Sequence, residues 1–160
     1  METASNPSSP ILIRPLKLVD LDAVVALFQE LARKSITFEF TPQGEERLLR
    51  SNNADSLRTY IADGFRYWVA ECDQTLAGFV GMRGNSHLYH LFVAEAFQRR
   101  GLARRLWHVA RDACLKDGNP GKFTVNSSNN AVAVYEALGF RRTLPMQNVD
   151  GVLFNPMILE

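Results

Sequence analysis

Apolar and polar positions along the chain recur with two periods, one typical of helices and the other of strands. Helical spacing of apolar residues predicts helices over residues 21–33, over 44–63 with a break at 51–53, from 101 to a stop at 117–121, and over 131–138. Short apolar runs between turn residues predict strands over residues 11–14, 66–72, 76–82, 87–93, 122–126, 140–143 and 152–159. Pro156 predicts that part of the last strand is an edge or a bulge. The strand–helix–strand order over residues 87–126 predicts a parallel, right-handed crossover within one α/β domain that has a mixed sheet.

The junction between the strand at 87–93 and the next helix is unusually basic. Four arginines surround this helix start: Arg99, Arg100, Arg104 and Arg105. The positive end of the helix dipole repels each exposed cation there by roughly 0.3–1 kcal/mol, so a bound anion explains their presence. Backbone N–H groups at the helix start suit a phosphate or pyrophosphate, and Gly101 allows close approach. The alternative is a solvent-facing basic surface, since arginine is a good helix former. The glycine spacing matches neither the phosphate-loop nor the dinucleotide-binding motif, which disfavours ATP and nicotinamide cofactors.

Length, composition and charge indicate an ordinary soluble domain. The chain has 160 residues, of which 46% are hydrophobic and 22% charged, and its net charge of +1 favours neither nucleic acid nor a membrane as partner. Cys72 and Cys114 lack metal-ligand spacing and are expected to be buried small hydrophobes in a reducing compartment. Residues 1–10 lack the features of a signal peptide and are expected to form a disordered tail before a domain over 11–160. No apolar run approaches the roughly 18 residues of a membrane span, so a cytoplasmic location is expected.

Two motifs resemble those of the GNAT superfamily of acyl-CoA-dependent N-acetyltransferases. The segment Gln98–Ala103 resembles the family's Q/R-x-x-G-x-G/A signature, with Ala103 as a permitted variant. Asn126 at a strand end, followed by Tyr135–Phe140, resembles the second motif, Y-E-x-L-G-F. The resemblance extends over residues 11–159. It implies a single-domain GNAT-like fold, in which helices flank a mixed, mostly antiparallel central sheet with one parallel strand–helix–strand crossover at the cofactor site.

The resemblance also implies acetyl-CoA as cosubstrate and no metal. The main chain of residues 91–93 would pair with the pantetheine arm, and the loop and helix start would receive the pyrophosphate. The residues so implied in cofactor binding are Leu91, Phe92, Val93, Gln98, Arg99, Arg100, Gly101, Leu102, Ala103, Arg104, Asn126 and Ser128. Ser128 stands where many relatives carry asparagine.

The implied reaction is attack of an amine on a thioester, so the amine must arrive deprotonated. That step costs roughly 4–5 kcal/mol at pH 7 for a lysine-like amine, about 1 kcal/mol for an α-amino group, and nothing for an arylamine. His87 occupies a strand position where several relatives carry glutamate, and it is the candidate base; the alternative is a histidine bonded to backbone. His90 lies on the other face unless the strand has a bulge, and Glu71 is a candidate acting through water. Tyr135 is the family's general-acid position, or else a core aromatic on the helix's apolar stripe.

The expected function is therefore acetyl transfer from acetyl-CoA to a primary amine of a small molecule or a peptide. A catalytically silent acyl-CoA-binding module is the alternative, and the resemblance also allows a homodimer. A nucleic-acid binder is disfavoured because the sequence has no stacking platform of aromatic and basic residues. Phe38 and Phe40 either wall the acceptor pocket or cover the core.

Overall fold

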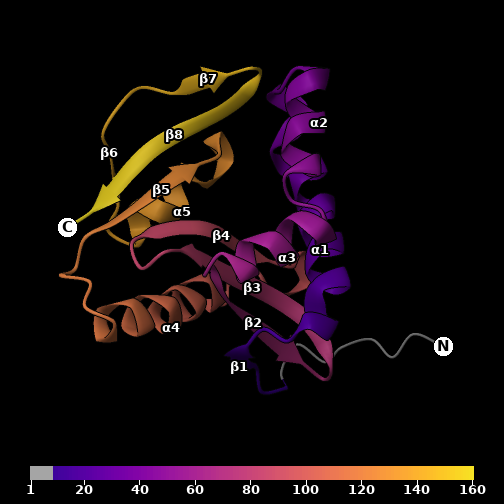
Figure 1. Ribbon diagram of the computed structural model, residues 1–160, viewed down its shortest axis with the longest axis vertical. Helices are drawn as coiled ribbons and strands as arrows, with labels where there is room; N and C mark the ends of the chain where they lie inside the picture. Colours follow the sequence, from indigo (N-terminus) through magenta and orange to yellow (C-terminus); the bar gives the residue numbers. More distant parts are fainter. Residues whose placement is uncertain (1–8) are drawn as a thin grey trace.

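A central sheet of eight strands organises the fold in the computed structural model, which describes residues 9–160 (Figure 1). The strands are β1 (Leu12–Pro15), β2 (Arg66–Cys72), β3 (Thr75–Arg83), β4 (His87–Val93), β5 (Phe123–Ser127), β6 (Arg141–Arg142), β7 (Gln147–Val149) and β8 (Val152–Leu159). Their order is β1-β2-β3-β4-β5-β8-β6, and β7 also pairs with β8. Only the β4–β5 pair is parallel among the described strands. The predicted mixed, mostly antiparallel sheet is therefore confirmed, whereas residues 1–8 of the predicted tail lie outside the described residues.

Five α-helices connect and cover these strands within the described chain. They are α1 (Leu21–Ser35), α2 (Pro42–Arg50), α3 (Ala54–Ala62), α4 (Leu102–Lys116) and α5 (Val132–Ala137). The predicted break at 51–53 separates α2 from α3, because the Asn53 side chain accepts a hydrogen bond from Ser56 N–H and so caps a new helix. Thr41 caps α2 in the same way, through Gly44 N–H. No helix among residues 9–160 has both the length and the apolar character needed to cross a bilayer.

The sheet separates two apolar cores, one under each layer of helices (Figure 1). On one face α4 buries Leu102, Leu106 and Trp107 against β2, β3 and β4. On the other face α1 packs on β3 and β4 through residues at the predicted helical spacing, such as Val24 and Phe28. Both cysteines are buried, as predicted.

Two irregularities of β4 shape the middle of the sheet. Gly81 of β3 pairs with His90 and Met82 pairs with Leu88, so Tyr89 is an extra residue and forms a β-bulge. Leu88 consequently faces the α4 core while His90 faces the α1 core. The second irregularity is that β5 pairs with β4 only at His87 and Leu88, after which the two strands separate. Residues 89–93 therefore have β3 on one side and no strand of residues 9–160 on the other.

Part of β8 is a local edge, as Pro156 predicted, because β6 pairs only with Met157 and Ile158 and β7 only with residues 152–154, while β5 pairs along the other side. The Pro156 carbonyl accepts a hydrogen bond from Thr143 N–H at the point where pairing with β6 ends. The strand tolerates the proline ring there. The missing N–H points to the same side and costs no ladder hydrogen bond. The short strand β7 was not predicted.

Candidate active site

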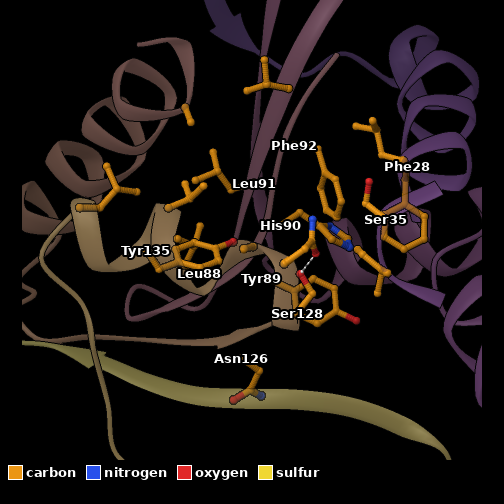
Figure 2. A pocket seen from close by; sticks show the side chains of 18 of the residues that line it. Phe28, Ser35, Leu88, Tyr89, His90, Leu91, Phe92, Asn126, Ser128 and Tyr135 are labelled. Atoms are coloured by element: carbon orange, nitrogen blue, oxygen red, sulfur yellow. Dashed lines mark hydrogen bonds between the residues drawn. The ribbon is translucent and has the colours of Figure 1, made fainter. Parts of the chain in front are cut away.

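A cavity of about 870 Å³ opens where β4 and β5 separate. The residues implied in cofactor binding all line it except Arg100, and so do His87, His90 and Tyr135. Figure 2 shows Leu91 and Phe92 on one side of this space, Asn126 and Ser128 on the other, and Tyr135 projecting between them. The separation of the two strands thus brings together the two motifs that the sequence places more than twenty residues apart.

One end of the cavity is the start of α4. Gly101 precedes the helix with φ +75° and Arg99 has φ +62°, so two residues with a left-handed backbone lie on either side of Arg100, and successive N–H groups in such turns can form an anion-binding nest. The first N–H groups of α4, from Leu102 onward, have no acceptor within the helix. A Cβ at position 101 would meet no atom within 4 Å, which leaves the approach to these groups open. The geometry fits a phosphate group.

Side chains fix this loop to its surroundings. Gln98 donates its amide N–H to the carbonyl of Val93 (3.0 Å), which ties the loop to the end of β4. Arg104 donates to the carbonyl of Ala137 (2.9 Å) at the end of α5, and the residue also lines the cavity. Arg105 instead donates to the carbonyl of Ile11, away from the cavity. Three of the four arginines at the helix start therefore have distinct positions: Arg99 and Arg104 at the cavity, and Arg105 outside it.

Tyr135 belongs to both the core and the cavity. Its ring packs edge-on against Phe140 at 5.8 Å between centroids, and only 8% of the residue is exposed. Burial raises the pKa of the Tyr135 phenol, so it keeps its proton at neutral pH. Its hydroxyl points into the cavity (Figure 2), where it can act as a proton donor. The two sequence interpretations of Tyr135 are compatible, because α5 is only half covered by the core.

His87 lines the cavity at the end where β4 and β5 still pair. Its Nδ1 lies 2.8 Å from Thr124 Oγ1 on the neighbouring strand. Burial and the positive charge of Arg83 lower the pKa of His87 to about 4. The imidazole is therefore neutral at pH 7 and weakly basic, so its role as base stays a prediction, and an amine that loses its proton readily suits it better.

His90 is part of the cavity wall, where hydrogen bonds on both ring nitrogens hold it in place. The bulge at Tyr89 turns it to the α1 side, and it contacts the ring of Phe28. Asn52 donates its amide to the Leu48 carbonyl, so its Oδ1 accepts from His90 Nε2–H at 2.7 Å. The Tyr67 hydroxyl then donates to His90 Nδ1 at 2.9 Å. Burial lowers the pKa of His90 to about 3, and both ring nitrogens are engaged, so His90 is a neutral positioning group.

Sequence reasoning missed the partners of His90, although one signal was present. A glycine inside a strand is a sign of close approach by another group, and at Gly81 in β3 a Cβ would collide with the ring of Tyr67. Glu71, by contrast, does not line the cavity and pairs with Arg14 (3.3 Å), so the structure does not bring it to the site. Phe40 lines the cavity, while Phe38 is 69% exposed.

Comparisons with known proteins agree with this geometry. A family model described as "Acetyltransferase (GNAT) domain" matches residues 36–160. The mouse protein "Probable N-acetyltransferase family 8 member 5" is 31% identical over 108 residues, covering 59% of this chain and 47% of that protein. Human "N-acetyltransferase 8" is 28% identical over 109 residues, with the same coverage. The match thus spans about half the length of these curated relatives.

A solved structure, the PaiA N-acetyltransferase from Thermoplasma acidophilum in complex with coenzyme A, superposes with a TM-score of 0.76. It is 19% identical and the match covers 93% of this chain and 98% of the other, which shows a shared fold. A GNAT-family acetyltransferase from Staphylococcus aureus gives a TM-score of 0.71 at 16% identity, over 93% of this chain and 98% of that one. Because the family model matches residues 36–160, from just after α1 to the last residue, this chain belongs to the GNAT acetyltransferase family.

Proposed function

We propose that this protein is an N-acetyltransferase that moves an acetyl group from acetyl-CoA to a primary amine, by direct attack of the amine on the thioester. The observation that carries the proposal is the unpaired edge of β4 leading straight to the nest at the start of α4. An extended amide-containing arm can pair with such an edge as an added strand, and a phosphate can occupy the nest.

The proposed binding residues divide by chemistry. Main-chain groups of Leu91, Phe92 and Val93 would hold the arm, with Asn126 and Ser128 facing them from the far wall. Main-chain N–H groups from Arg99 to Arg104 and the guanidinium groups of Arg99 and Arg104 would hold the pyrophosphate, whereas the Gln98 N–H already donates to the Glu95 carbonyl. Acetyl-CoA supplies the activated acetyl group.

The proposed catalytic roles follow from protonation states. Tyr135 holds a proton on its hydroxyl at neutral pH and would deliver it to the sulfur as the carbon–sulfur bond breaks. A main-chain N–H near Phe92 would stabilise negative charge on the carbonyl oxygen. His87, neutral at pH 7, would accept the proton that the amine loses, directly or through water.

Calorimetric titration with coenzyme A, followed by an assay of thiol release from acetyl-CoA with a panel of amines, tests the proposal. Coenzyme A binding together with amine-dependent thiol release is the expected result. Binding without thiol release for any amine would favour the silent acyl-CoA-binding module instead. The absence of binding by the folded protein would refute both. A homodimer and a cytoplasmic location stay predictions.

A further inference from the structure

The residues that line the cavity indicate which class of amine it can accept. We propose that the acceptor is a free amino acid with an apolar side chain, and that Arg83 binds its carboxylate. The inference rests on the proposed acetyl transfer and names the acceptor class for the same site.

The part of the cavity between β4, α1, α2 and β8 is apolar and aromatic. The residues that line it there include Phe28, Leu31, Phe40, Leu48 and Phe154. Such a wall favours burial of an apolar acceptor body, since removing apolar surface from water is favourable.

The charged residues of the lining are all positive. Within the described chain they are Arg83, Arg99 and Arg104, and no carboxylate lines the cavity. Acidic residues of α2 and of the turn before β8 are already engaged, because Glu45 accepts from Thr37 and Asp150 pairs with Arg47. A polyamine or a lysine side chain would enter without a counter-charge for its ammonium groups, which disfavours these acceptors.

Arg83 is set apart from the other two arginines. It is the last residue of β3 and opposes His87 in the antiparallel register, so the two side chains lie on one face. Arg99 and Arg104 lie beyond the other end of β4. No ion pair of Arg83 occurs among residues 9–160, yet its charge acts on His87 and Tyr89. An unpaired guanidinium beside the candidate base is suited to bind a carboxylate in bidentate fashion.

The low basicity of His87 also favours an amino acid as the acceptor. His87 has a pKa near 4, which makes it a poor base for a strongly basic amine. An α-amino group has a lower pKa than a lysine side chain, so a larger fraction is deprotonated without help. An amino acid, whose carboxylate Arg83 can bind, is therefore also an acceptor that a weak base can deprotonate.

Access to this side is restricted by a contact that we call the α2–β8 bridge, formed by Thr41, Gly44 and Arg47 of the α2 region and by Asp150 and Gly151 before β8. Arg47 and Asp150 form an ion pair at 2.5 Å, and the backbones at Gly44 and Gly151 touch. Figure 1 shows the start of β8 reaching α2, so the two sides of the fold meet there. A bridge across this end favours a free amino acid over a peptide chain that must pass through.

The test compares four acceptors at saturating acetyl-CoA: phenylalanine, phenethylamine, spermidine and an Nα-blocked lysine amide. We expect kcat/KM for phenylalanine to exceed that for phenethylamine by at least about tenfold, the worth of one charge-assisted hydrogen bond. Arg83→Gln should abolish this preference by raising KM for phenylalanine much more than KM for phenethylamine, whereas any change in kcat caused by the loss of the Arg83 charge beside His87 should be shared by both amines. Arg83→Lys should retain part of it, and Arg142→Gln, at an exposed position outside the cavity lining, should retain all of it.

The possible results distinguish a wrong acceptor class, a wrong role for Arg83 and a wrong proposed function. Thiol release with phenethylamine, spermidine or blocked lysine at rates equal to or above phenylalanine would overturn the acceptor class while leaving acetyl transfer intact. A preference for phenylalanine that survives in Arg83→Gln would remove Arg83 as the carboxylate ligand. Thiol release with none of the amines would refute the proposed function itself and the inference with it. Equal melting temperatures of the variants would show that the kinetic changes are not unfolding.

Discussion

Replacing Gly101 by aspartate places a negative charge where the proposed pyrophosphate would lie. The backbone at Gly101 has φ +75°, and a Cβ there would meet no atom within 4 Å. The new side chain therefore fits sterically and costs only the strain of a left-handed residue, about 1–2 kcal/mol or less for aspartate and asparagine. For a chain of this length, 1 kcal/mol lowers the melting temperature by roughly 2–4 °C.

The electrostatic penalty can be estimated separately from this strain. One phosphate charge about 6 Å from the new carboxylate is repelled by roughly 0.7 kcal/mol in water and by about 3 kcal/mol at an effective dielectric constant of 20. Affinity for coenzyme A should therefore fall about 3-fold to 100-fold. Gly101→Asn is the matched control, because asparagine has the same shape as aspartate and tolerates the same backbone but carries no charge.

Isothermal titration calorimetry with coenzyme A measures the effect on Gly101→Asp and Gly101→Asn. We expect the aspartate variant to bind coenzyme A more weakly than the asparagine variant. The difference in affinity between the two variants should become smaller as salt is added. Similar melting temperatures would show that both are folded. Equal coenzyme A affinities of the two variants at low salt would refute the placement of an anion at the start of α4.

Three further predictions concern other parts of the molecule. Tyr135→Phe should lower kcat about 100-fold or more with the affinity for coenzyme A unchanged; an unaltered kcat would exclude Tyr135 as the acid. His87 and His90 have folded-state pKa values of about 4 and 3, below the unfolded value near 6.5, so the unfolded chain takes up protons first as pH falls. Stability should therefore be complete above pH 6.5 and decrease by about 2 kcal/mol for each histidine by pH 5, as measured by urea unfolding, and a flat profile would contradict the burial of both rings. Gly44→Ala would bring a Cβ into the Gly151 carbonyl and open the α2–β8 bridge, so a peptide amine should become a better acceptor relative to a free amino acid while coenzyme A affinity stays the same. An unchanged ratio of kcat/KM for peptide and free amino acid would show that the bridge does not restrict the acceptor.

The strand–helix unit of β4 and α4 was predictable because local patterns encode it. The apolar run at 87–93 and the helical stripe from Leu102 depend on neighbours a few residues away, and both elements occur where predicted. The same holds for the break between α2 and α3, which depends on the cap at Asn53. The fold class followed from the order of these elements and from the resemblance to a known family.

Features that depend on contacts between distant residues were not predictable in this way. Tyr89 becomes a bulge only through its register with β3, and that bulge decides which face His90 occupies. His90 then binds Asn52 and Tyr67, which lie 38 and 23 residues away in sequence. Arg83 had no sequence signal at all, because its place beside His87 follows from the pairing of β3 with β4.

Because β5 separates from β4 after Leu88, the β4 edge beyond that residue is unpaired and lines the cavity. Such edges on a molecular surface attract strands of other chains and promote aggregation. Here residues of α5 and β8 line the same cavity, so the unpaired edge faces them and not the outer surface. A slender linear molecule can enter and complete the hydrogen bonding, and its occupancy should protect the native protein against heat in proportion to the logarithm of its concentration.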